Sequence, residues 1–281
     1  MPALIAVTGA TGHLGGLVAR HLDAAGRPLR LLVRDPTSPR IPALGSVTDV
    51  AVADYADPDA ARAALEGVDV LLMVSAHESP DRARDHATFV DAAAAAGVRH
   101  VVYTSFAAAA PDATFTLARD HFATEQRIRA SGMAWTFLRD TFYLDFVPDL
   151  VGADGVIRGP AGDGRCAFVA RADVARVAAA VLLDPAAHAG RTEDLTGPEG
   201  LSLADAARIV GRARGTEVTF HDETLDEAYA SRAVYGAPDW QVDAWVSTYT
   251  AIASDVMARP TDAVERITGT PPLSLDRLLR A

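Results

Sequence analysis

Short apolar runs alternate with Ala-rich segments of helical length from the N-terminus to about residue 145. The runs consist mostly of Leu, Val, Ile and Ala, which is typical of strands that are covered on both faces. They predict strands at Leu4–Val7, Leu29–Val33, Val47–Ala53, Val68–Val74, Val98–Thr104 and Ala134–Leu138. The segments between them predict helices at about Gly12–Ala24, Pro58–Leu65, Arg82–Ala96 and Ala118–Ser131. This alternation predicts an α/β fold with a Rossmann-type doubly wound parallel sheet and right-handed crossovers.

The pattern changes after residue 150, where a series of Gly and Pro residues from Gly152 to Gly164 indicates an irregular, turn-rich stretch. A helix over about Ala172–Leu183 is expected to pack back on the sheet. Further elements are predicted near Glu193–Thr196 (strand), Ser202–Arg212 (helix) and Glu217–Phe220 (strand), followed by helices. We therefore predict a main domain over residues 1–150, to which residues 165–185 return, and a smaller C-terminal α/β portion over residues 151–281.

Residues that favour helix ends support these boundaries. Four predicted helices are each followed by a glycine, at Gly26, Gly67, Gly97 and Gly132. Glycine adopts the left-handed conformation of a helix C-cap more easily than any other residue. Ser202, three residues before Asp205, resembles a capping box with Asp in place of the usual Glu.

A glycine-rich segment, Thr8-Gly9-Ala10-Thr11-Gly12-His13-Leu14-Gly15, directly follows the first predicted strand and opens the first predicted helix. A dinucleotide pyrophosphate needs a tight turn, a close backbone approach and a helix N-terminus that points its amides at the anion. Gly9 and Gly12 can supply the turn and the approach, and Gly15 lets the helix lie close to the strand. Because strand, loop and helix come in the required order, we predict an NAD(P)-binding site rather than a merely structural turn.

The second predicted strand ends in Arg34 and Asp35, followed by Pro36. An acidic residue at this position favours the ribose hydroxyls of NAD, whereas an Arg favours the extra phosphate of NADP. Arg34 comes first, and Pro36 indicates a turn that leads away. Since a guanidinium can hold a phosphate with two parallel hydrogen bonds, we predict NADPH in preference to NADH. The alternative is a surface Arg34 paired with Asp35 in solvent.

Charge and composition narrow the choice of partners. The 281 residues include 26 basic residues, all of them Arg, and 37 acidic ones, which gives a net charge of −11. An acidic chain repels nucleic-acid phosphates, so no nucleic-acid binding is expected. We expect a cytoplasmic protein without a membrane segment, because no apolar stretch reaches spanning length and no signal peptide is evident. Cys166 has the features of an apolar strand residue, and the eight His show no metal-ligand spacing, so no metal is expected.

A series of segments, all in the same order, resembles the NmrA-like group of atypical short-chain dehydrogenases, and within it the quinone oxidoreductase type 2 branch. The segments are the glycine loop, Val33-Arg34-Asp35, Ala53-Asp54-Tyr55, Val102-Tyr103-Thr104-Ser105, Asp120-His121-Phe122-Ala123-Thr124-Glu125 and Phe137-Leu138-Arg139. The resemblance covers nearly the whole chain. It implies an NADP-binding Rossmann domain, a small substrate-binding portion, an NADPH-dependent reductase of quinones and a small homo-oligomer.

The same resemblance implies roles for single residues. It places Gly9, Thr11, Gly12, His13 and Leu14 on the pyrophosphate, Arg34 on the 2′-phosphate, Asp54 and Tyr55 beside the adenine, and Ser75, Ala76 and His77 along the path to the nicotinamide. Gly15, Ser105, His121 and Phe142 complete the expected cofactor-binding set.

The chain contains no Lys, so it lacks the Tyr-x-x-x-Lys pair of typical short-chain dehydrogenases. That pair supplies the general acid of carbonyl reduction. A quinone demands less of the protein, because the cofactor carries the difficult chemistry. His121 is a candidate for the place of the missing Lys and for a proton donor near neutral pH, and the alternative is a histidine on the helix surface.

Other candidate side chains follow the predicted strands. Ser105 ends the fifth strand, either at the ligand-binding edge or as an ordinary strand-end serine. Phe142 and Tyr143 follow the sixth strand, where Phe142 would line the nicotinamide pocket and Tyr143 would donate a proton, with plain packing as the alternative. A C-terminal group of aromatic residues predicts either a pocket for a flat substrate or the core of a helical layer: Tyr229, Tyr235, Trp240, Trp245 and Tyr249.

Two functions of different classes fit these features. The first is an NADPH-dependent oxidoreductase that transfers hydride to a quinone or a related enone or aromatic carbonyl, with the proton coming from His121, Tyr143 or water. The second is a non-catalytic NADP(H)-binding redox sensor that acts through a protein partner, because a fold does not settle a function. A tailoring reductase of secondary metabolism is a third possibility.

Overall fold

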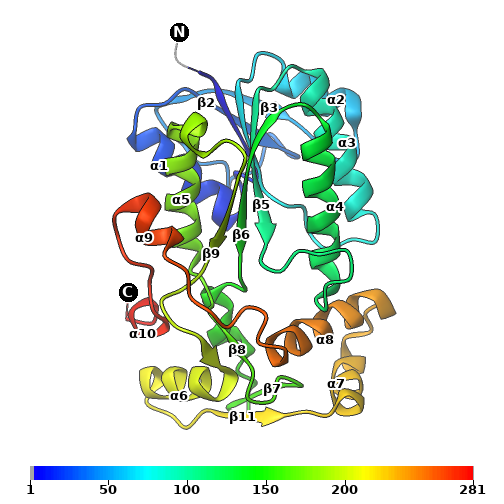
Figure 1. The fold of residues 1–281 in the computed structure, drawn as a ribbon, viewed down its shortest axis with the longest axis vertical. Helices are drawn as coiled ribbons and strands as arrows, with labels where there is room; N and C mark the ends of the chain where they lie inside the picture. The colour runs from blue at the N-terminus through cyan, green and yellow to red at the C-terminus, as the bar shows by residue number, and fades with distance from the viewer. Residues whose placement is uncertain (1–2, 281) are drawn as a thin grey trace. The chain divides into compact units, whose positions relative to one another are not determined.

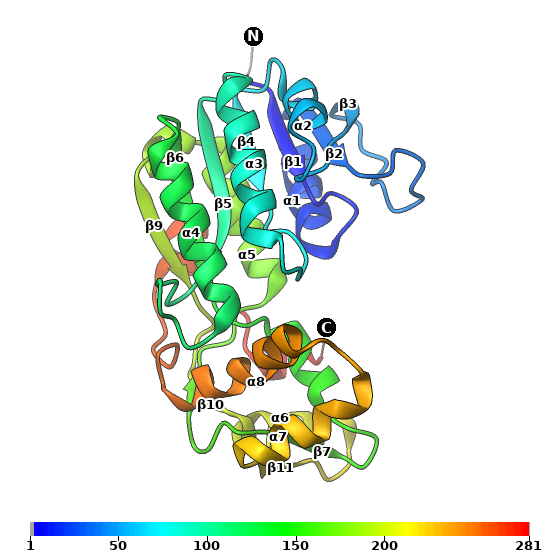
Figure 2. The ribbon, with the colours of Figure 1, turned by 90° about the vertical axis from the view of Figure 1, so that its right-hand side faces the viewer.

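Seven strands form one sheet in the computed structural model, in which residues 3–280 are described. The strands are β1 (Ile5–Thr8), β2 (Leu29–Val33), β3 (Val47–Val52), β4 (Val70–Met73), β5 (His100–Phe106), β6 (Ala134–Asp140) and β9 (Arg191–Leu195). Their order is β3-β2-β1-β4-β5-β6-β9, which Figure 2 shows from the side. The β1–β2, β1–β4, β2–β3 and β4–β5 pairs are parallel. The predicted Rossmann-type sheet is therefore confirmed, and its strand order reverses between β1 and β4.

Helices cover both faces of this sheet. They are α1 (His13–Ala24), α2 (Pro58–Leu65), α3 (Arg82–Ala95), α4 (Thr116–Ala130) and α5 (Arg171–Leu183), with a short 3-10 helix, η2 (Pro185–His188), after α5. Figure 1 shows α1 and α5 on one face, and α2, α3 and α4 on the other. The predicted C-cap glycines all adopt left-handed backbone angles, with φ of 64° at Gly26, 75° at Gly67, 83° at Gly97 and 84° at Gly132.

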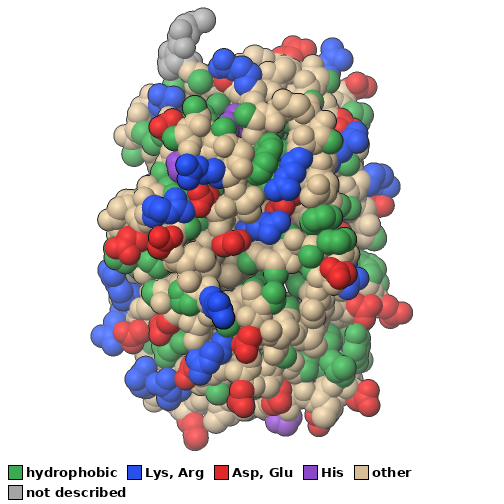
Figure 3. Space-filling view, in the orientation of Figure 1, with side chains coloured by type: hydrophobic (Ala, Val, Ile, Leu, Met, Phe, Trp, Pro, Cys, Tyr) green, Lys and Arg blue, Asp and Glu red, His purple; other side chains and the backbone are tan. Residues whose placement is uncertain are grey.

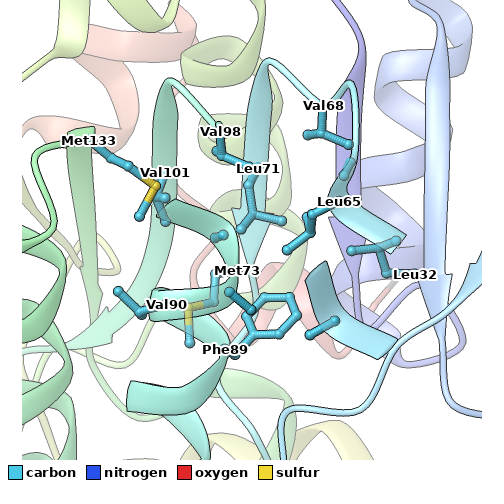
Figure 4. Close-up of a cluster of buried hydrophobic side chains, with 14 of the residues drawn as sticks. Leu32, Leu65, Val68, Leu71, Met73, Phe89, Val90, Val98, Val101 and Met133 are labelled. Atoms are coloured by element: carbon cyan, nitrogen blue, oxygen red, sulfur yellow. The ribbon is translucent and has the colours of Figure 1, made fainter. Parts of the chain in front are cut away.

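One cluster of buried hydrophobic side chains lies between the sheet and helices α2 and α3. Figure 4 shows Phe89 among Leu65, Leu71 and Met73, and these side chains are fully buried. Burying one such side chain contributes roughly 1.5 to 3 kcal/mol relative to leaving it in water. The apolar runs of the sequence are therefore explained by a sheet that is covered on both sides.

The chain divides into two compact units. Unit 1 contains the residues up to Phe106, Asp120–Arg139 and Ala172–Glu193, and unit 2 contains Ala107–Arg119, Asp140–Arg171 and the residues from Asp194 onward. The expected division had one main boundary near residue 150. In the structure the chain crosses between the units several times, because each unit is assembled from segments that are distant in sequence.

Unit 2 is built from short strands and helices. Its elements are η1 (Leu144–Leu150), β7 (Val156–Gly159), β8 (Arg165–Cys166), β10 (Leu201–Ser202), α6 (Leu203–Arg214), β11 (Thr219–Asp222), α7 (Leu225–Arg232), η3 (Ala233–Tyr235), α8 (Asp239–Ala253), α9 (Ala263–Thr268) and α10 (Leu275–Leu278). Strand β11 pairs with β7 in parallel, and β10 pairs with β8 antiparallel. The predicted capping box is present, since the Ser202 hydroxyl accepts from the Asp205 amide at 3.1 Å and the Asp205 carboxylate accepts from the Ser202 amide at 3.4 Å.

The charged surface carries many Arg side chains next to acidic ones, as Figure 3 shows for one face. Examples are the pairs Arg99–Asp69 and Arg158–Asp154, each 2.6 Å apart. Exposed pairs of this kind contribute at most about 1 kcal/mol each. No helix within residues 3–280 is long and apolar enough to cross a membrane.

Candidate functional site

The glycine loop joins the end of β1 to the first turn of α1. Gly9 adopts a left-handed conformation with φ of 63°, and its carbonyl oxygen accepts a hydrogen bond from the Gly12 amide at 2.8 Å. A Cβ atom on Gly15 would lie 2.4 Å from that same carbonyl oxygen. Only glycine at position 15 therefore allows α1 to approach the strand so closely.

The N-terminus of α1 is suited to an anion. Gly12 is the N-cap residue, no side chain caps the helix, and the first turn carries no acidic residue. The first amides of a helix have no partner within the helix and carry partial positive charge. The structure places the whole predicted loop set here, namely Gly9, Thr11, Gly12, His13, Leu14 and Gly15. The loop therefore fits a dinucleotide pyrophosphate.

The end of the neighbouring strand β2 presents an unpaired guanidinium. Arg34 is exposed, and no hydrogen bond or ion pair engages its side chain within residues 3–280. The Asp35 carboxylate accepts hydrogen bonds from the amide and the hydroxyl of Thr37, at 2.8 and 2.6 Å. These bonds hold the pKa of Asp35 below its usual value. The alternative of an Arg34–Asp35 pair is absent from the structure, because Asp35 bonds within its own turn.

Asp54 and Tyr55, which follow β3 by two and three residues, have different environments. Asp54 is exposed, and its carboxylate accepts from the Ala56 amide at 2.9 Å. The Tyr55 ring stacks on Phe89 with ring centres 4.1 Å apart. Its hydroxyl lies 2.8 Å from the Thr8 hydroxyl and 2.7 Å from the Val74 carbonyl oxygen. Tyr55 thus packs beneath the ends of β1 and β4, and Asp54 alone presents its side chain to solvent.

The segment after β4 is held by side chains from three other elements. The amides of Val74, Ser75 and Ala76 donate to Thr8 Oγ1, Thr104 Oγ1 and His86 Nε2, at 2.8, 2.9 and 2.9 Å. The carbonyl oxygen of Ala76 accepts from Arg82 Nε at 3.0 Å. Ser75 and Ala76 are half-buried, and His77 is exposed.

His121 lies in a buried polar network behind this segment. Its Nε2 is 2.9 Å from Arg82 Nη2, and its Nδ1 is 2.9 Å from the Tyr103 hydroxyl. Burial and the nearby Arg82 charge hold the pKa of His121 well below its usual value. Because a guanidinium can only donate, Nε2 is the accepting nitrogen and Nδ1 carries the proton. His121 is therefore neutral, and both of its nitrogens are engaged.

His86 occupies the same network. Its Nδ1 lies 2.9 Å from the Thr124 hydroxyl, while its Nε2 accepts from the Ala76 amide. Burial, and next the charge of Arg82, lowers the pKa of His86 from 6.5 to about 3. His86 is therefore also neutral, with its proton on Nδ1.

Ser105 belongs to a second buried cluster near the end of β5. Its hydroxyl donates to Glu125 Oε1 at 2.6 Å. Arg139 holds the same fully buried carboxylate with two bonds, from Nε at 2.8 Å and from Nη2 at 2.7 Å. A bidentate pair of this kind fixes the carboxylate and, through it, the Ser105 hydroxyl.

In unit 2, Tyr143 donates a hydrogen bond to Asp140 Oδ2. Asp140 is buried, and its other carboxylate oxygen has no partner within residues 3–280. Burial raises the pKa of Asp140 to about 7, and burial together with Asp140 raises the pKa of Tyr143. Phe142 faces Phe115, with ring centres 5.2 Å apart.

Unit 2 also contains a cavity of about 630 Å³, which is a common size for a small-molecule site. Its lining includes Tyr235, Trp245 and Tyr249, together with Arg158 and Arg232. Arg232 is paired with buried Glu223 at 2.9 Å, and its guanidinium carbon lies 4.9 Å from the centre of the Tyr249 ring. The walls therefore include three aromatic rings beside aliphatic and polar residues, among them Asp149, and each guanidinium already has a carboxylate partner.

The C-terminal aromatic residues thus separate into two groups. Tyr235, Trp245 and Tyr249 line the cavity, whereas Tyr229 and Trp240 are absent from its lining. Cys166 is buried in β8, and burial raises the pKa of its thiol to about 12, as an apolar strand position requires.

Three functional candidates were missed in the sequence: Arg82, His86 and Asp140. Arg82 and His86 lie one helical turn apart in α3, so both reach the same buried region. That spacing was the available signal, but it does not by itself distinguish a buried pair from a solvated one. Asp140 gave a weaker signal as an acidic residue at the end of an apolar strand.

Comparisons with known proteins agree with this geometry. The family model described as "NmrA-like family" matches residues 1–234. An NAD(P)H azoreductase of Xenophilus azovorans is 32% identical over 99% of this chain and 97% of its own length. The NADPH complex of a quinone oxidoreductase of Escherichia coli is similar with a TM-score of 0.87 and 31% identity, covering 98% of each chain. The NADP(H) complex of a Citrobacter triphenylmethane reductase is similar with a TM-score of 0.87 and 30% identity, covering 98% of this chain and 99% of the reductase chain.

The buried histidines predict a loss of stability in mild acid. His86 and His121 titrate near pH 6.5 in the unfolded chain, whereas burial keeps them neutral in the folded protein. Below that pH the unfolded chain binds more protons, so the free energy of unfolding falls by roughly 1.4 kcal/mol per pH unit for each residue until its folded pKa is reached. Over the interval from roughly pH 7.5 to pH 5.5 each histidine contributes a loss of about 1.4 kcal/mol, so urea unfolding of His86→Gln should lose about 1.4 kcal/mol less than that of the wild-type protein. An unchanged loss in this variant would contradict a neutral, buried His86.

Proposed function

Since this chain belongs to the NmrA-like family, we propose that it is an NADPH-dependent oxidoreductase that transfers hydride to a flat, conjugated acceptor such as a quinone. The observation that carries the cofactor choice is the unpaired guanidinium of Arg34 at the carboxyl end of β2, beside a strand whose loop fits a pyrophosphate. Similar proteins are named as reductases of azo compounds, quinones and triphenylmethane dyes, which are all conjugated acceptors.

The residues of unit 1 fit this cofactor. The first-turn amides of α1 would bind the pyrophosphate, Arg34 the 2′-phosphate, and Asp54 the adenosine side of the molecule. Ser75, Ala76 and His77 follow β4, which neighbours β1 at the point where the strand order reverses, and ligands of open α/β sheets bind at such points. When bound, NADPH supplies the hydride.

Reduction of a quinone by hydride also needs one proton, and the chain has no Lys to assist a tyrosine. We assign proton donation to the Tyr143 hydroxyl, and we assign to Asp140 the return of a proton to the Tyr143 oxygen afterwards. Asp140 is protonated in part of the molecules near pH 7, so it can return a proton to the Tyr143 oxygen. The alternative donor is water.

His121 and Ser105 are assigned supporting roles. The proton on His121 is already donated to Tyr103, and its low pKa disfavours an imidazolium near neutral pH. Ser105 donates to Glu125, so its hydroxyl is oriented for a ligand to donate to it. His121 and Ser105 would therefore hold the residues of the cofactor site in place. The alternative for each is a direct catalytic role.

The cavity of unit 2 fits the ring system of the acceptor. Aromatic faces stack on flat conjugated molecules, and both guanidinium groups in the lining are neutralised by carboxylates. These features favour an uncharged bicyclic or tricyclic acceptor over an anionic one.

The acceptor assignment is tested by NADPH oxidation with benzoquinone and naphthoquinone. We expect turnover of naphthoquinone, and we expect Trp245→Ala to raise its KM by roughly tenfold, since an aromatic contact of about 1.4 kcal/mol is lost. Trp240→Ala is the matched control, because Trp240 lies on the same helix outside the cavity lining. Tight NADPH binding without turnover of any quinone would contradict the reductase and favour the redox sensor.

The cofactor choice is tested by titration with NADPH and NADH. Arg34→Ala should weaken NADPH binding by roughly 10- to 100-fold, because it removes charge-assisted bonds to the 2′-phosphate, and should leave NADH nearly unchanged. Arg20→Ala is the control, since Arg20 is exposed on α1 and its substitution removes the same charge. Equal weakening for both nucleotides would remove the assignment of Arg34.

The proton donor is tested by the pH profile of quinone reduction. The carboxyl of Asp140 ionises as the pH rises through about 7, so kcat should fall above this pH if the Asp140–Tyr143 pair supplies the proton. Tyr143→Phe should lower kcat by at least about tenfold, and Asp140→Asn should abolish the fall above about pH 7. Wild-type rates and an unchanged profile in both variants would assign the proton to water.

A further inference from the structure

We propose that Arg82 and His86 are positioning residues of the cofactor site, which fix the Ser75–His77 segment by bonding both backbone groups of Ala76. This inference rests on the proposed NADPH-dependent function and identifies the residues that shape its nicotinamide side. Each side chain acts through the backbone of Ala76.

Within residues 3–280, the backbone groups of Val74, Ser75 and Ala76 make no hydrogen bond to the backbone of a neighbouring strand. In a Rossmann sheet the chain leaves the ladder here, and a backbone amide without a partner is costly unless something else accepts from it. Here three successive amides, those of Val74, Ser75 and Ala76, are each accepted by a side chain. The acceptors come from β1, β5 and α3, so the path of the segment is set by elements on three sides.

Ala76 is the one residue of the three that is held at both its amide and its carbonyl group by side chains of α3. His86 accepts from its amide at 2.9 Å, and Arg82 donates to its carbonyl oxygen at 3.0 Å. The N–H and C=O of Ala76 belong to two successive peptide groups, and neither group can rotate without breaking a partly buried hydrogen bond to α3. The direction of the Ala76 backbone is therefore fixed by α3.

The two bonding side chains are themselves buried and held by further polar contacts. His86 is fully buried and bonded to Thr124, whose hydroxyl donates to the Asp120 carbonyl oxygen at 2.7 Å. Arg82 is 4% exposed, lies 3.3 Å from the Asp120 carboxylate and contacts His121 at 2.9 Å. Helix α4 thus supports α3, and α3 supports the segment.

A packing role alone does not account for a buried guanidinium at this position. Removing such a charge from water costs several kcal/mol, and well-packed apolar residues often replace buried charges without loss of stability. An apolar residue would fill the space, but it could not donate to the Ala76 carbonyl group. The same holds for His86, because only an acceptor can satisfy the Ala76 amide.

The test measures the segment and the cofactor separately. In His86→Leu, we expect faster hydrogen exchange at the Ala76 amide and a roughly tenfold weaker NADPH affinity. His86→Gln should recover most of both, because its amide group can accept from Ala76 and donate to Thr124. Thr124→Val is a milder variant that frees Nδ1 of His86 and should shift both readouts in the same direction.

The matched control is His100→Leu. His100 is also buried, and its Nε2 lies 2.9 Å from the Thr136 hydroxyl, but it begins β5 at the opposite end of the strand from the site. This variant should lose a similar free energy of unfolding while keeping the exchange rate of Ala76 and the affinity for NADPH.

Three results would overturn the inference. The first is an unchanged NADPH affinity in both His86→Leu and Thr124→Val, and the second is an equal weakening in His100→Leu. If the wild-type protein binds NADPH, either of these results in the variants would overturn this inference and leave the proposed function standing. The third is a wild-type protein that binds neither NADPH nor NADH, which would overturn the proposed function and the inference together.

Discussion

Helix α1 can begin at the end of β1 only because Gly15 has no side chain. A Cβ atom there would lie 2.4 Å from the Gly9 carbonyl oxygen, and that oxygen belongs to backbone that cannot yield without moving the strand. The close approach brings the first amides of α1 to the end of β1. The other parts of the cofactor site follow from this placement, since Arg34 ends the strand on one side of β1 and the Val74–Ala76 segment follows the strand on the other.

The parts of the fold that depend on nearby residues could be predicted from the sequence. A glycine after a helix adopts a left-handed C-cap wherever the helix ends, and the Ser202–Asp205 capping box needs only three residues. The parallel sheet followed from the alternation of apolar runs and helical segments. The glycine loop was found for the same reason, because its turn, close approach and helix start lie within eight positions of one another.

The contacts that join distant residues could not be predicted. Tyr55 follows β3 at the ligand edge, yet its ring stacks on Phe89 of α3. His121 was expected either beside the cofactor or on the helix surface, and the structure buries it between Arg82 and Tyr103. The parallel pairing of β7 with β11 joins two segments that no local pattern connects. In each case the contacts of the residue depend on which helices and strands pack together. The type of a residue and its local sequence do not determine that packing.

Arg is the only basic residue type among the Lys and Arg positions of the chain, and the planar guanidinium allows one side chain to bond several separate acceptors. Arg82 reaches a backbone carbonyl group, an imidazole and a carboxylate at once, because its donors lie on separate nitrogens of a rigid plane. An ammonium group places all its donors on one atom and could not span these three acceptors. Arg34 has the same planar fork, but Asp35 is engaged in its own turn and leaves the fork without a partner. For these two Arg, the engagement of the nearby carboxylate therefore decides whether the guanidinium is paired inside the protein or exposed to solvent.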